Sequence, residues 1–300
     1  MTDHVETLRA AALGDARARA FAALEPDRKI RNPDTLAREF LDPGERPDPD
    51  EPEQVGKFRT NLEAVLPGAY YLQNARTFHL DACLRRAIDG GFRLVVLLGA
   101  GFDTRAHRLA GAEHDVRFFE VDFGEIQREK KAALEHLPGS GARNIHYVAS
   151  DFEADALADI ADAPGYDSSE PTFFIWEGRS VDMTEDDVDA VLDFVSQHSV
   201  PDSGIVFDYV PRSMIDGSVA YYGGEEFRAF MDQSGRPLSF GIEDRNLRRF
   251  LAQRNFELTA LVTNHELETR YLMDSDGVPH GHVPGYARIA EATIIRRRGT

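Results

Sequence analysis

The chain has 300 residues, of which 42% are hydrophobic, and its formal net charge is −18 at pH 7. This length and apolar content suffice for one large α/β domain, and the negative charge argues against nucleic acid or a membrane surface as a partner. The single cysteine, Cys83, excludes an intrachain disulfide, and we expect neither a signal peptide nor a transmembrane segment. We therefore expect a cytoplasmic protein.

Helices are expected throughout the N-terminal part of the chain, about residues 1–90. Residues 4–25 are rich in alanine and other helix formers, and residues 55–72 form a second helical segment that breaks near Pro67 and Gly68. A further helix is predicted over residues 82–88, ending at two glycines. Residues 42–54 combine prolines with acidic residues, which is typical of a surface loop.

The chain is organised around residues 94–122. The continuous apolar run 94–98 predicts a strand buried on both faces of a parallel sheet. The glycine turn Gly99-Ala100-Gly101 follows at once, and a second apolar run over 116–121 ends in Asp122. A strand, a glycine turn, a helix and a strand that ends in an acid form a nucleotide-binding βαβ unit. In such a unit the acid accepts hydrogen bonds from ribose hydroxyls.

The residues after the glycine turn narrow the choice of cofactor. A dinucleotide site favours a third glycine where this chain has Thr104, and the preceding Asp103 would repel a diphosphate. Asp103 could instead accept a hydrogen bond from an ammonium group. S-adenosylmethionine has an ammonium group and no phosphate, so the sequence favours it over NAD. A nicotinamide-dependent oxidoreductase remains the alternative.

Three further buried strands are predicted over residues 144–150, 171–176 and 204–210. A helix over 184–198 begins with Thr184 as its cap and Asp187 at the capping-box position. Two final strands, 256–263 and 288–297, are expected to be antiparallel at their end of the sheet. The predicted fold is a single Rossmann-like α/β domain. It has a mostly parallel seven-stranded sheet, helices on both faces, a cofactor-binding core over 91–210, a helical cap over 211–246 and C-terminal strands over 247–300.

Three motifs, LGAGFDTR at 98–105, EVDF at 120–123 and WEG at 176–178, resemble those of the leucine carboxyl methyltransferase family. This family consists of class I S-adenosylmethionine-dependent O-methyltransferases, with bacterial members in secondary metabolism. The resemblance covers the chain from about Ala16 to its C-terminus. It implies methylation of a carboxylate or hydroxyl of a small molecule, such as a polyketide-like metabolite.

The resemblance also implies roles for particular residues. Arg76 is expected to pair with the cofactor carboxylate, with Arg17 as the alternative, because a guanidinium offers a fork of donors. Asp151 and Phe152 are expected at the adenine, and Glu177 near the methionine portion. The full set of expected cofactor contacts is Arg76, Gly99, Ala100, Gly101, Asp103, Asp122, Phe123, Asp151, Phe152 and Glu177.

Methyl transfer requires neither a metal nor a covalent nucleophile, and we expect no metal site. A carboxylate acceptor is already ionised, whereas a hydroxyl would need a base. The candidates for an acceptor wall or a base are Tyr209, Tyr221, Tyr222, His265, His280 and His282. Asp182 stands where the family often has a tyrosine, so the acceptor can differ from that of relatives. The acceptor, the oligomeric state and a non-catalytic, cofactor-binding alternative are left open.

Overall fold

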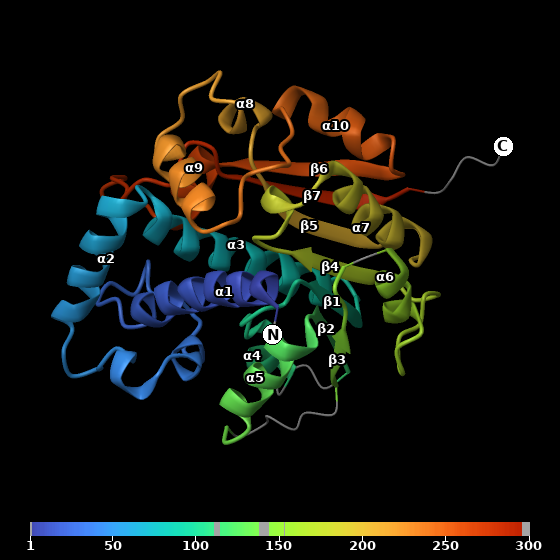
Figure 1. The fold of residues 1–300 in the computed structure, drawn as a ribbon, viewed down its shortest axis with the longest axis horizontal. Helices are drawn as coiled ribbons and strands as arrows, with labels where there is room; N and C mark the ends of the chain where they lie inside the picture. Colours follow the sequence, from blue (N-terminus) through green and yellow to red (C-terminus); the bar gives the residue numbers. More distant parts are fainter. Residues whose placement is uncertain (1, 111–114, 138–143, 153, 296–300) are drawn as a thin grey trace.

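The computed structural model describes residues 2–110, 115–137, 144–152 and 154–295. Its strands form one sheet of seven in the order β3-β2-β1-β4-β5-β7-β6 (Figure 1). The strands are β1 (Leu94–Leu98), β2 (Arg117–Asp122), β3 (Ile145–Ala149), β4 (Thr172–Trp176), β5 (Gly204–Tyr209), β6 (Phe256–Thr263) and β7 (Arg288–Ile294). The first five strands are parallel, and β7 is antiparallel to both β5 and β6. This arrangement confirms the predicted fold class.

The strand register places three predicted site segments at one edge of the sheet. Leu98, the last residue of β1, is aligned with Val121 on β2 and with Trp176 on β4. The carboxyl ends of these parallel strands therefore lie side by side. The order of the strands reverses between β1 and β4, and open α/β sheets bind ligands at such a switch point.

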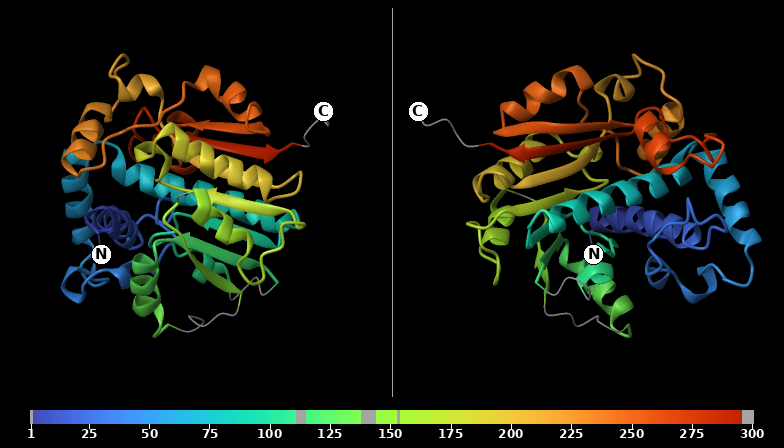
Figure 2. Two further views of the ribbon diagram at one scale, coloured as in Figure 1. Left: turned by 45° about the vertical axis from the view of Figure 1, so that its right-hand side comes forward. Right: turned by 180° about the vertical axis from the view of Figure 1, so that it is seen from behind.

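Helices cover both faces of the sheet, as the two views in Figure 2 show. Alternate residues of β1 point to opposite faces, so Val96 packs in one core and Val95 in the other. One core contains residues of α6 (Ala154–Ala161), α7 (Glu185–Gln197) and α10 (Asp244–Ala252). The other contains residues of α3 (Ala69–Asp89), α4 (Arg105–Ala110) and α11 (Asn264–Tyr271).

The remaining elements lie around the carboxyl edge of the strands. Helix α1 (Asp3–Ala22) packs with the short η1 helix (Ala37–Phe40) and with α5 (Gly124–Leu134), and α2 (Glu53–Val65) packs against α3. The short helices η2 (Pro43–Glu45) and η3 (Ser180–Asp182) lie in connecting segments. In the cap region lie α8 (Arg212–Ile215) and α9 (Gly224–Gln233); Figure 1 shows α8 above the sheet and α9 to its left. Among the described residues, no helix combines the length and apolar character needed to cross a bilayer.

The third N-terminal helix is longer than the sequence predicts. We expected it to begin at residue 82, but α3 begins at Ala69 and includes the polar stretch 74–81. Within that stretch Asn74, Arg76, His79 and Asp81 are all buried. Their polarity concealed an interior helix face, because these side chains are stabilised by partners that lie far away in the sequence.

Candidate cofactor site

The glycine turn after β1 and the acid at the end of β2 are joined directly. Gly99 and Gly101 have φ values of +67° and +41°, which side-chain-bearing residues rarely adopt. The carboxylate of Asp122 accepts hydrogen bonds from the backbone N–H of Gly101 at 2.6 Å and of Phe123 at 2.7 Å. Burial raises the pKa of Asp122 in spite of these bonds. The acid is therefore held in one orientation beside the turn.

A cleft at this edge of the sheet is lined by five carboxylates and five arginines. They are Asp15, Asp34, Asp103, Asp122 and Glu177, and Arg19, Arg105, Arg108, Arg179 and Arg236. Equal numbers of opposite charges leave the wall without a formal net charge. Four of the arginines pair with acids through ion pairs of 2.9 Å or shorter. Ion pairs within the protein therefore fix the orientation of most of the arginine side chains in the wall.

Arg105 joins three acids from different parts of the chain. Its guanidinium lies 2.9 Å from Asp81, 2.5 Å from Asp103 and 2.6 Å from Glu177. Burial alone would raise the pKa of Asp103, but Arg105 and neighbouring cations outweigh it and hold that pKa at about 2. Burial would also raise the pKa of Glu177, but the charges of Arg105 and Arg76 outweigh burial and lower that pKa. Both predicted acids are thus ionised at neutral pH.

Arg76 lies behind this wall and is not among the described residues that line the cleft. It is buried and pairs with Glu177 at 2.8 Å and with Asp208 at 2.6 Å. The other oxygen of Asp208 accepts the backbone N–H of Gly178. In this structure Arg76 therefore orients Glu177 and the turn after β4, and a direct contact with the cofactor carboxylate stays a prediction.

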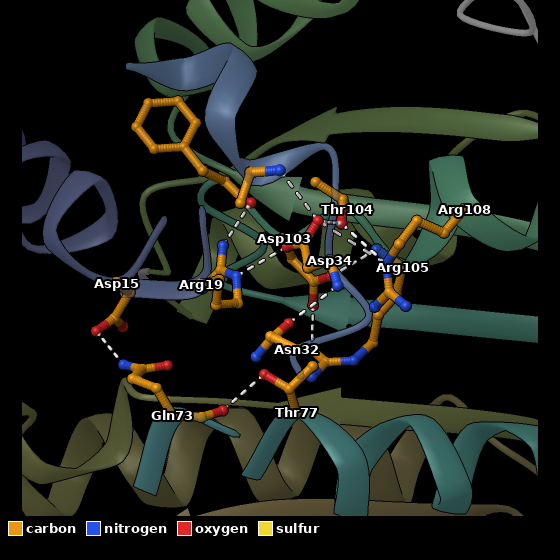
Figure 3. A network of polar contacts seen from close by, with 12 residues as sticks. Asp15, Arg19, Asn32, Asp34, Gln73, Thr77, Asp103, Thr104, Arg105 and Arg108 are labelled. Carbon is orange, nitrogen blue, oxygen red and sulfur yellow. Dashed lines mark hydrogen bonds and ion pairs between the residues drawn. The ribbon is translucent and has the colours of Figure 1, made fainter. Parts of the chain in front are cut away.

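Two arginines of α1 have different surroundings. Arg17 is partly exposed and pairs with Glu45, whereas Arg19 is buried and lines the cleft. Arg19 donates to Asp34 and to the carbonyl of Phe102, both at 2.8 Å (Figure 3). Residues two apart on a helix do not share a face. Arg17 was the expected alternative for the cofactor carboxylate, but of these two arginines only Arg19 lines the cleft.

The residues expected at the adenine lie near one another at the end of β3. Phe152 is buried, adopts a φ of +67° and lies 6.3 Å from Phe123 between ring centroids. Asp151 is exposed, and neither it nor the two phenylalanines is among the described lining residues. The guanidinium of Arg179 lies over the Phe152 ring, 5.8 Å from its centroid. The structure brings these rings together, and the adenine contact remains predicted.

None of the six candidates for an acceptor wall or a base is among the described residues that line the cleft. The hydroxyl of Tyr209 donates to Asp244 at 2.9 Å, and that of Tyr221 lies 3.0 Å from the Ser213 hydroxyl. Tyr222 is 50% exposed. The other three candidates are also outside the cleft: His265 is on α11, His280 lies beside Asp27 and His282 lies beside Glu268. A role for these residues as acceptor wall or base stays a prediction.

The carboxylates of the cleft fit S-adenosylmethionine better than a dinucleotide. Asp122 can accept ribose hydroxyls, and the ionised Asp103 and Glu177 favour a cation over a diphosphate. The absence of a Cβ at Gly99 and Gly101 allows close approach to the backbone.

Comparison with known proteins decides the family. The profile described as leucine carboxyl methyltransferase matches residues 12–196, more than half of the chain. The chain belongs to the leucine carboxyl methyltransferase family. A Streptomyces coelicolor relative named as an S-adenosyl-L-methionine-dependent methyltransferase is 34% identical over 69% of this chain and 71% of its own length. A relative of the same name from Mycolicibacterium gilvum is 30% identical over 66% of this chain, which spans 65% of that relative. This methyltransferase accordingly uses S-adenosylmethionine.

Solved structures support the fold of the methyltransferase. A Thermobifida fusca protein described as a methyltransferase superposes with a TM-score of 0.60, covering 91% of this chain and 96% of its own at 14% identity. A protein from Streptomyces avermitilis described as a duf574 family protein gives a TM-score of 0.61, covering 92% of this chain and 96% of its own at 14% identity. At such identity the likeness shows the fold alone.

None of the five cleft arginines was predicted from the sequence as a site residue: Arg19, Arg105, Arg108, Arg179 and Arg236. Only Arg105 had a local signal, because it ends the quoted LGAGFDTR motif. The pairing of Arg236 with Asp182 at 2.6 Å joins residues 54 positions apart. No local pattern indicates such a contact.

Proposed function

We propose that this methyltransferase transfers a methyl group to an oxygen of a small molecule, a carboxylate in preference to a hydroxyl. One observation carries the preference. The described residues that line the cleft include no histidine, tyrosine, cysteine or lysine. A hydroxyl acceptor would need one of the five wall carboxylates as its base. Four of them are ion-paired, and the fifth, Asp122, accepts hydrogen bonds from backbone N–H groups. A carboxylate needs no base.

The roles of the chain's own residues follow from this arrangement. Asp122 would hold the ribose hydroxyls, and Asp103 and Glu177 would lie by the cationic portion of the cofactor. Arg19 is the candidate for its carboxylate, with Arg76 behind Glu177. S-adenosylmethionine supplies a methyl on a sulfonium with a neutral leaving group. The acceptor oxygen forms the new C–O bond as the S–C bond breaks, and the protein supplies orientation and exclusion of water.

The biological setting is part of the same proposal. A secondary metabolite, such as a polyketide-like acid, is supported by the resemblance to bacterial family members. A cytoplasmic location, a small-molecule partner and the absence of nucleic acid or membrane partners stay predictions from composition and charge.

The experiment uses the purified protein, S-adenosylmethionine labelled in its methyl group and a panel of small carboxylic acids, phenols and alcohols. A methyl ester releases labelled methanol on alkaline treatment, whereas a methyl ether does not. We expect alkali-labile product from the wild type, and much less from an Asp122→Ala control at an S-adenosylmethionine concentration that does not saturate the variant. Product only on nitrogen, sulfur or carbon acceptors would refute oxygen methylation. Stable product on phenols alone would reverse the preference for a carboxylate.

A further inference from the structure

Arg179 crosses the cleft from the end of β4 towards the ends of β1 and β3. A Cβ placed on Gly99 would lie 2.6 Å from its Cγ and 3.2 Å from its Cδ, so the side-chain stem rests on that glycine. The guanidinium reaches the Phe152 ring. Arg179 thus occupies space over the glycine turn, at the switch point of the sheet.

Arg179 differs from the other arginines of the cleft in having no close counter-charge. Within the described parts of the chain it makes no ion pair and no hydrogen bond, and its contacts are the stem on Gly99 and the Phe152 ring. Burial lowers the pKa of Arg179, and Asp182 and Asp122 act on it only at longer range. A desolvated guanidinium without a partner favours an anionic ligand.

The two acids that act on Arg179 have close partners of their own, because Asp122 accepts from two backbone N–H groups and Asp182 pairs with Arg236. Asp182 pairs with Arg236 at 2.6 Å, and both side chains are nearly buried. This pair is neutral, so Arg179 is not compensated by it. The other oxygen of Asp182, Oδ1, is buried and has no hydrogen-bond partner. Asp182 therefore retains an acceptor for a further donor on the cap side of the cleft.

A cofactor bound against the glycine turn would compete with the stem of Arg179 for the space over Gly99. The side chain would then turn away from β1, and Asp182 offers it an acceptor. A guanidinium has five N–H donors, so one contact with Asp182 would leave most of them for another ligand.

We propose that Arg179, oriented by Asp182, binds an anionic group of the methyl acceptor. The ligand is a small acid that carries a carboxylate, and it would bind on the side of the cleft where Asp182 and Arg236 lie. Two parallel N–H donors of the guanidinium fit the two oxygens of a carboxylate. This inference rests on the proposed methyl transfer, and it adds the residue that selects a charged acceptor over a neutral one.

The test measures binding to the protein saturated with S-adenosylhomocysteine, by calorimetry. The probes are 4-hydroxycinnamate, 2-naphthoate and decanoate, each paired with its neutral amide. We expect at least one acid to bind about tenfold more tightly than its amide, and Arg179→Gln to abolish that difference. Arg179→Lys should restore only part of it, because an ammonium lacks the fork. Arg248→Gln, which removes an exposed arginine of α10, is the matched control for net charge and should keep the difference.

The affinity for S-adenosylhomocysteine gives a second readout. Arg179→Ala should bind it as tightly as the wild type or more tightly, because alanine lacks the Cγ and Cδ atoms that occupy the space over Gly99, and Arg179→Gln should bind it about as tightly as the wild type. A loss of about tenfold would make Arg179 a cofactor ligand and overturn the proposal. Equal binding of acids and amides, no binding of any acid, or an unchanged preference in Arg179→Gln would also overturn it.

The two proposals fail separately. Methylation of neutral phenols or alcohols without any preference for acids would leave oxygen methylation intact and remove the role of Arg179. Acid binding that depends on Arg179, with no methyl transfer to any oxygen, would do the opposite. Unfolding curves for each variant show whether a lost affinity reflects a lost fold.

Discussion

Replacing Arg105 with glutamine should destabilise the protein strongly at neutral pH. The change leaves Asp81, Asp103 and Glu177 without their shared cation in a buried wall. Holding the pKa of Asp103 at about 2 rather than 3.8 corresponds by itself to about 2.5 kcal/mol of native-state stabilisation. With the other two acids unpaired as well, we expect the free energy of unfolding to fall by roughly 3 to 5 kcal/mol.

The pH dependence provides the sharper part of this prediction. A carboxylate whose pKa is lower in the folded state contributes stability that is fully present above its unfolded pKa of about 3.9 and is lost as pH falls towards about 2. The wild type therefore loses the contribution of Asp103 in that window. The variant has less to lose, because only Lys130, Arg19 and the backbone N–H of residue 105 still favour the ionised form of Asp103. The difference between the two proteins should shrink below about pH 4.

Urea unfolding followed by circular dichroism, from pH 7 down to the lowest pH at which both proteins fold, measures this difference. Arg93→Gln is the matched control, because its pair with Asp115 is exposed and should contribute at most about 1 kcal/mol. A loss below about 1 kcal/mol for Arg105→Gln, or a loss that does not change with pH, would refute the argument that Arg105 holds ionised acids in the wall.

Three further predictions follow from the site. Asp122→Ala should weaken binding of S-adenosylhomocysteine about 10- to 150-fold, as expected for roughly 1.5 to 3 kcal/mol, and calorimetry on the folded variant that gives an unchanged constant would remove Asp122 from the ribose. Arg76→Lys should lower both the free energy of unfolding and this affinity, because a single ammonium cannot reproduce the separate ion pairs of Arg76 with Glu177 and Asp208. Equal values for the variant and the wild type would contradict the importance of these pairs. Tyr222→Ala should leave both quantities within about twofold or 0.5 kcal/mol, since the ring is half exposed and outside the cleft, and a tenfold loss of turnover would return it to the acceptor wall.

Local patterns were enough to predict the core of the fold. The apolar run 94–98, the glycines after it and Asp122 all follow from residues adjacent in the sequence, and the structure has each in the expected element. The capping box of Thr184 and Asp187 is likewise local and is present at the start of α7. The predicted sheet followed because buried parallel strands have a composition that tertiary context rarely overrides.

The cleft wall could not be predicted in the same way. Arg105 contacts Asp81 and Glu177, which are 24 and 72 positions away, and such pairs depend on how helices and strands pack. The start of α3 was missed for the same reason, because its polar residues are buried only when their distant partners are in place. Tyr221 of the cap packs against a cluster that includes Met214 of α8 and Met231 of α9, and such packing cannot be read from the local sequence.

The position of β7 has a consequence for how the protein is made. This strand comes last in the sequence but lies between β5 and β6, bonded to both. During synthesis β5 and β6 are made before the strand that joins them, so one edge of each stays unpaired until β7 has also emerged. Such edges are templates for aggregation. A truncation that removes β7 should therefore yield insoluble protein, and a fusion partner should be tolerated better before α1 than within the last strand.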